Sequence, residues 1–205
     1  NALVGIRLKY KLTNNIRLKG FTGQQRNNNF VNNVRYGPVI KGLSIEGDAN
    51  IGNVQLAPGA GVLNRTLDKD SYSTVASGIV NQVAQDTTAP RFTPVYNMYA
   101  FSVYNTLTYK NLSWYVEGAY KSSEAIRKDS FIYNKPGTVF FTSVNYGMKG
   151  VALSLTGKRT EDFVMRTSPN EILLNGMMNW QPIVAVLRPE RLISRYTPAS
   201  QDVSE

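Results

Sequence analysis

Glu46 and Asp48, two positions apart, are the chain's one arrangement of side chains that could do acid–base chemistry. Residues i and i+2 of a β-strand share a face, so the two carboxyl groups would be neighbours. In a polar interior, however, such acids usually pair with bases, and we expect Arg17, Lys19 or Lys121 to be the partners. We therefore interpret the acidic pair as structural and predict that the protein is not an enzyme.

The composition excludes several other kinds of site. The 205 residues include no cysteine and no histidine, which rules out disulfides, thiolate nucleophiles, Ser-His-Asp triads and histidine or cysteine metal sites. The acids of the expected loops lack the spacing of a calcium-binding loop, and we interpret them as solvated: Asp68, Asp70, Asp86, Asp129 and Glu161. No metal and no cofactor is predicted.

Positive charge is concentrated near the amino terminus. The formal net charge is +9, and Arg7, Lys9, Lys11, Arg17 and Lys19 alternate with apolar residues on either side of a short polar turn. If they share one face of a hairpin that lines a channel, they would concentrate anions; alternatively, acids from strands outside this segment balance them. No arginine-rich tract or RNA-binding motif is present, so no nucleic-acid partner is predicted. The predicted charged lining of a lumen is Arg7, Lys9, Lys11, Arg17, Lys19, Glu46, Asp48, Glu117 and Lys121.

These residues lie in stretches where apolar and polar residues alternate with period two, the pattern of a half-buried strand. Eight such stretches occupy residues 4–12, 16–26, 39–51, 54–65, 96–109, 112–122, 138–148 and 151–160. Very short turns join them in pairs, and connections of about 12, 30 and 15 residues separate the pairs. Long strands with short turns at one end and long loops at the other are typical of outer-membrane barrels. The sequence thus predicts an all-β, antiparallel, up-and-down transmembrane β-barrel.

Aromatic residues near the ends of these stretches form a candidate interfacial belt in contact with outer-membrane lipid. The predicted belt is Tyr10, Tyr96, Tyr99, Tyr109, Trp114 and Tyr146. The stretch 54–65 is the least regular, because Pro58 cannot donate a backbone hydrogen bond, and it predicts an edge, a bulge or a bend there.

The chain divides into a barrel segment, residues 1–168, and a different segment, residues 169–205. Ser168, Pro169 and Glu171 predict the start of a short helix, followed by polar loop, as a plug or an extracellular connection. Both ends of the chain look cut from something larger, so we expect part of a larger barrel. A closed eight-stranded barrel with an extra tail is the alternative.

Several short motifs resemble an uncharacterised family of outer-membrane β-barrels of the Bacteroidota. They are residues 5–12, 18–20 and 23–26 of one hairpin, the strand at 115–121, the Tyr-Asn-Lys-Pro-Gly loop at 133–137, and residues 150–155, 158–162 and 165–166. The resemblance implies a barrel in the bacterial outer membrane and a parent chain longer than this one. That family has no established activity, so the resemblance implies no reaction.

Two functional classes remain open. In the first, the protein is a porin-like channel or a scaffold subunit that binds other envelope proteins. In the second, it is a soluble, secreted all-β binding domain, such as a carbohydrate-binding sandwich. Its sugar-stacking platform would then be Tyr104, Tyr115, Trp114 and Trp180.

Overall fold

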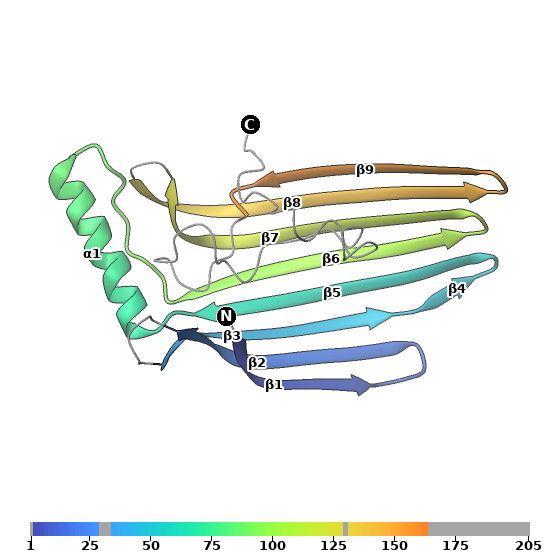
Figure 1. Cartoon of the computed structure of the whole chain (residues 1–205), viewed down its shortest axis with the longest axis horizontal. Coiled ribbons are helices and arrows are strands. Elements are labelled where there is room, and N and C mark those ends of the chain that lie inside the picture. Colours follow the sequence, from blue (N-terminus) through green and yellow to red (C-terminus); the bar gives the residue numbers. More distant parts are fainter. Residues whose placement is uncertain (1, 29–33, 129–130, 164–205) are drawn as a thin grey trace.

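The computed structural model describes residues 2–28, 34–128 and 131–163, and most of them belong to one antiparallel sheet (Figure 1). The strands are β1 (Ala2–Lys11), β2 (Ile16–Asn28), β3 (Val34–Gly47), β4 (Ala49–Ile51), β5 (Val54–Thr66), β6 (Asn97–Tyr109), β7 (Leu112–Lys128), β8 (Phe131–Met148) and β9 (Val151–Glu161). One helix, α1 (Lys69–Gln85), lies between β5 and β6. The strands pair in the order β1-β2-β3-β5-β6-β7-β8-β9, with β4 also on β5. The predicted all-β, up-and-down arrangement is confirmed.

Strand β4 is the continuation of β3, because the register against β5 runs unbroken from Glu46↔Gly59 to Ala49↔Leu56. The interruption between them lies opposite Pro58, which has no N–H to give to the ladder. On the other side, the Asp48 N–H continues the β2–β3 ladder and donates to the Asn15 carbonyl at 2.8 Å. Pro58 therefore marks an irregularity, as predicted, in the interior of the sheet and not at its edge.

Four tight turns gather at one end of the sheet, and α1 lies at the other (Figure 1). Gly52, Lys110 and Gly150 adopt positive φ in three of these turns, the backbone that two-residue hairpin turns require. The fourth turn joins β1 to β2 and is closed by the Leu12 N–H donating to the Ile16 carbonyl. All four short connections lie where the sequence predicts them.

Within the described residues, β1 and β9 do not pair, so the sheet is open. The predicted antiparallel sheet is confirmed, whereas its closure into a transmembrane barrel stays a prediction. The predicted helix after Ser168 and the segment 169–205 lie outside the described residues.

The predicted loop of about 15 residues before residue 138 is wrong. Strand β7 runs on to Lys128 and β8 begins at Phe131, so the Tyr-Asn-Lys-Pro-Gly motif at 133–137 is part of β8. A register shift between Lys121 and Glu124 separates the two halves of this long hairpin. The one extra residue on β7 changes which side chains share a face, and this breaks the simple alternation on which the strand prediction depends.

Helix α1 occupies the connection that the sequence analysis treats as polar loop. It begins at an N-cap, where the Asp68 carboxylate accepts from the Ser71 N–H at 3.1 Å. Val75 and Ile79, four residues apart, are buried against Ile132 of β8. The capping aspartate and the four-residue spacing are the signals that could have predicted the helix.

The Gln82 side chain ties α1 to the sheet. Its Oε1 accepts from the Ile132 N–H at 2.7 Å, and its Nε2 donates to the carbonyls of Ile132 at 3.1 Å and Pro90 at 2.8 Å. Gln82→Ala leaves buried backbone groups unsatisfied, so we expect the local stability of α1 to fall by about 1–3 kcal/mol. Hydrogen exchange of the α1 amides measures this loss. The matched control is Gln85→Ala, since Gln85 is exposed on the same helix. Equal exchange rates in the two variants would contradict a stabilising role for the Gln82 hydrogen bonds.

Candidate functional site

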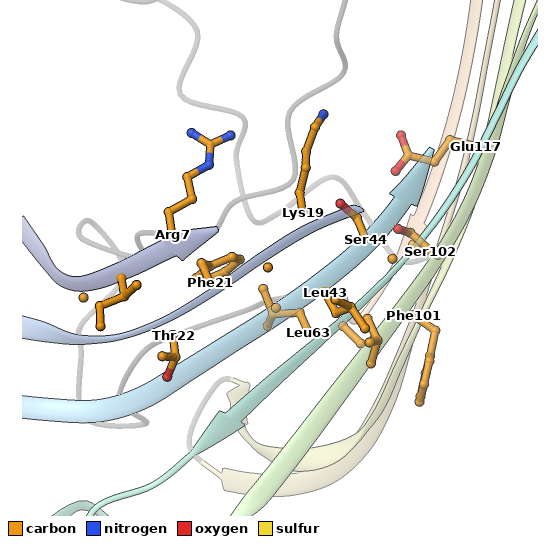
Figure 2. Close-up of a pocket in the computed structure, with 18 of the residues that line it drawn as sticks. Arg7, Lys19, Phe21, Thr22, Leu43, Ser44, Leu63, Phe101, Ser102 and Glu117 are labelled. Atoms are coloured by element: carbon orange, nitrogen blue, oxygen red, sulfur yellow. The ribbon is translucent and has the colours of Figure 1, made fainter. Parts of the chain in front are cut away.

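The register sorts the strand residues into two faces of opposite character. One lateral row of paired residues crosses the sheet from β1 to β9. It runs Lys11↔Arg17, Arg17↔Glu46, Glu46↔Gly59, Gly59↔Tyr104, Tyr104↔Glu117, Glu117↔Phe141 and Phe141↔Lys158. We call the face that carries this row the polar face, and the opposite side the apolar face. Figure 2 shows Arg7, Lys19, Ser44 and Glu117 rising on one side of the ribbon, with Phe101 and Thr22 on the other.

The apolar face carries large side chains that are exposed. Ile6 of β1 is 76% exposed, Val103 of β6 65% and Leu155 of β9 70%. The row extends across the whole sheet: Val4, Ile6, Leu8, Leu43, Ile45, Ile51, Phe101, Val103, Phe140, Met148, Val151, Leu153 and Leu155. In a water-soluble sheet these positions would be expected to pack against a second layer.

Aromatic residues mark both margins of the apolar face. Beside the short turns lie Tyr10, Tyr109, Trp114 and Tyr146, all exposed and all predicted for the belt. Toward the α1 end lie the predicted Tyr99 and, two strand positions beyond Gly118, Tyr120. The other predicted member, Tyr96, precedes β6 and stacks on Tyr72 of α1, with ring centroids 4.0 Å apart.

The polar face holds the predicted acid–base pairs. Arg17 contacts Asp48 at 3.0 Å and Glu46 at 3.8 Å, and Lys19 contacts Glu46 at 2.5 Å. The two acids are thus neutralised by neighbouring bases, which supports their structural interpretation. Lys121 lies farther along the sheet and pairs with Glu124 instead.

Two tyrosines extend this polar row across the middle of the sheet. Tyr104 Oη donates to Glu46 at 3.2 Å, and Tyr115 Oη donates to Glu117 at 2.8 Å. Their rings lie 6.4 Å apart. Trp114 faces the opposite side, where its indole N–H donates to Thr142, so the predicted sugar-stacking platform does not form as one surface. Trp180, its fourth member, lies outside the described residues.

A hollow of about 720 Å³ opens beside this row (Figure 2). Small residues on the polar face, Gly61, Ser102 and Ala119, leave room for it. The charged and polar residues that line it come from several strands and include Arg7, Lys19, Ser44 and Glu117. Phe163 lines the end nearest α1. In the part of the chain that the structure describes, no three acidic side chains gather as metal ligands would.

A buried ionic triad lies toward the α1 end of the sheet. Glu124 accepts from Arg65 at 2.7 Å through one carboxylate oxygen and from Lys121 at 2.7 Å through the other. All three side chains are at most 5% exposed. The alternation pattern predicts Lys121 as lumen lining but gives no sign of Arg65 and Glu124, because the register shift after Lys121 brings Glu124 onto the same face.

The chain leaves β9 toward this triad. Asp162 has φ of 44°, a left-handed conformation that turns the backbone sharply, and its carboxylate pairs with Lys135 at 3.4 Å. Phe163 then packs on Met98 and Ala100 of β6. The residues just after β9 therefore lie over the polar face and not beyond the sheet.

In the described residues, no helix is long and apolar enough to cross a membrane.

Comparison with known proteins identifies a family whose function is unknown. No curated protein and no solved structure matches the chain. A family described as "Family of unknown function (DUF6029)" matches residues 1–196. Because that match covers nearly the whole sequence, the chain belongs to the DUF6029 family.

Proposed function

We propose that this sheet is the wall of a transmembrane β-barrel in a bacterial outer membrane, and that the barrel forms a porin-like channel. The observation that carries the proposal is the exposed apolar face, bordered by aromatic rings at both margins. Tyr99 and Tyr109 lie ten positions apart on β6. Ten residues of a strand tilted by about 40° rise roughly 25 Å, which is the height of the apolar band of outer-membrane barrels.

The energetics of this face favour lipid over water. Single exposed apolar residues are normal in soluble proteins, but contiguous apolar patches beyond several hundred Å² mark an interface. Here the exposed side chains extend from β1 to β9. Acyl chains would cover this surface without a second protein layer.

A membrane also requires that every backbone hydrogen bond be satisfied, so an open sheet edge is not tolerated within the hydrocarbon. The proposal therefore includes closure: strands beyond the described residues, or a rearranged pairing, must complete the ladder at β1 and β9. The polar face would then surround a lumen containing the ion pairs of Arg17 and Lys19. The resemblance of the hairpin at 5–26 to Bacteroidota outer-membrane barrels supports the same location.

Fractionation of cells expressing the full protein tests the location. We expect the protein in the outer-membrane fraction, retained after alkaline washing and released only by detergent. Recovery in a soluble fraction without detergent would contradict the proposal. It would instead favour the soluble binding domain, although the opposite orientations of Tyr115 and Trp114 count against the sugar platform suggested for it.

Conductance separates a channel from a scaffold. The scaffold function is favoured by α1 and the long β7–β8 hairpin, which offer a surface for envelope partners at the end opposite the short turns (Figure 1). Folded protein reconstituted in a planar bilayer should show discrete conductance steps if it is a channel. Folded, inserted protein that conducts no ions would contradict the channel and favour the scaffold.

A further inference from the structure

We infer that the polar face of β1 and β2 is an anion-attracting track, which makes the proposed channel selective for small anions over cations. The inference rests on the proposed function and specifies its substrate class. The track is defined by Arg7, Lys9, Lys11, Arg17 and Lys19.

The register places these five cations together. Lys9 lies directly opposite Lys19, and Lys11 lies directly opposite Arg17. Side chains at directly opposed positions are separated by only about 5 Å at Cβ, and like charges there are destabilising. The hairpin thus holds closely spaced positive charges that would be stabilised by anions.

The acids supplied by the neighbouring strand neutralise only part of this charge. Arg17 and Lys19 pair with Asp48 and Glu46 on β3. Among the described residues, no acidic side chain lies within ion-pair distance of Arg7, Lys9 or Lys11, and all three are exposed. Five cations against two acids leave three positive charges on the strand at the sheet's edge.

The hollow beside the track is lined mostly by apolar residues, but a few of its groups can bind an anion. Arg7 and Lys19 stand on one side of it, and the Ser44 and Ser102 hydroxyls line its middle (Figure 2). Hydroxyl groups can donate hydrogen bonds to a partly dehydrated anion, as a guanidinium can. Glu117 on the far side repels anions and keeps them near β1 and β2. The three cations of β1, Arg7, Lys9 and Lys11, are of one sign. Such charges along a low-dielectric wall raise the local concentration of counter-ions by roughly tenfold or more.

The reversal potential in a KCl gradient tests this inference on the full protein in a planar bilayer. We expect chloride to be at least about threefold more permeant than potassium in the wild type. The R7Q/K9Q/K11Q variant should bring the permeability ratio close to one. The matched control, K41Q/K110Q/K149Q, removes the same charge from the apolar face and from two short turns, and it should leave the ratio unchanged.

A second variant moves the ratio in the opposite direction. E117Q removes a negative charge from the wall of the hollow, so chloride selectivity should rise, and this result does not depend on the triple variant folding. A conducting channel whose ratio is unaffected by both R7Q/K9Q/K11Q and E117Q would overturn the inference and leave the channel intact. Folded protein without conductance would overturn the proposed function, and the inference with it. Cation selectivity in the wild type would also overturn the inference, because acids of other strands would then outweigh the track.

Discussion

Replacing Glu124 by glutamine is expected to lower the free energy of unfolding by about 3–5 kcal/mol. The Glu124 carboxylate is the shared partner of Arg65 and Lys121, each at 2.7 Å, and the three side chains are almost completely buried. Glutamine keeps the shape but removes the charge, so two buried cations remain without their shared counter-charge. Urea unfolding of the full protein in detergent micelles, followed by circular dichroism, measures the loss.

Two further variants show whether the loss comes from the buried charge. Glu161→Gln breaks the exposed pair with Arg159, where solvent screens the charges, and it should cost less than about 1 kcal/mol. R65L/K121M/E124L removes all three charges together and should recover most of the stability lost in E124Q, because no isolated charge stays buried. If E124Q were as stable as E161Q, the triad would not contribute as described.

Val103→Arg is expected to destabilise the folded, inserted protein by about 2–4 kcal/mol, the cost of an arginine facing lipid near the bilayer midplane. Val103 is 65% exposed on the apolar face and lies close to midway between Tyr99 and Tyr109 on β6. If that face met water, the same substitution would cost little and would raise solubility. Folding into lipid vesicles across a urea series gives the free-energy difference.

The neighbouring residue supplies the control for position and charge. Ser102→Arg adds the same side chain one residue earlier on β6, but it projects into the hollow on the polar face. We expect S102R to insert within about 1 kcal/mol of the wild type, since a wet lumen accommodates a charge. Equal losses in V103R and S102R, or no loss in either, would contradict the assignment of the two faces.

Much of the fold is predictable from the sequence, because the alternation of apolar and polar residues within each strand indicates which side chains share a face. Alternation at Val4, Ile6 and Leu8 against Arg7 and Lys9 predicts β1 and its orientation without any tertiary information. The short turns identify their partners, since a two-residue turn permits only an antiparallel hairpin. The alternation also predicts Arg17, Lys19 or Lys121 as partners of Glu46 and Asp48; Arg17 and Lys19 are confirmed, whereas Lys121 pairs with Glu124.

The features that the sequence analysis missed depend on contacts between distant residues. Helix α1 is stable because Val75 and Ile79 are buried against β8 and Gln82 bonds to Ile132, some fifty residues away along the chain. The ionic triad needs the register shift after Lys121, which no alternation pattern reveals in advance. Within the described residues β1 and β9 do not pair, so closure of the sheet stays a prediction.

Quenching of Trp114 fluorescence by lipids brominated on their acyl chains tests the lipid-facing assignment most directly. In a W180F background Trp114 is the only tryptophan, and it lies exposed on the apolar face near its margin. We predict strong quenching by lipids brominated near the headgroup end of the chain. A tryptophan moved one residue to the polar face, in W114F/Y115W/W180F, should be quenched weakly. Trp114 fluorescence that is unaffected by brominated lipid but quenched by aqueous acrylamide would contradict the account.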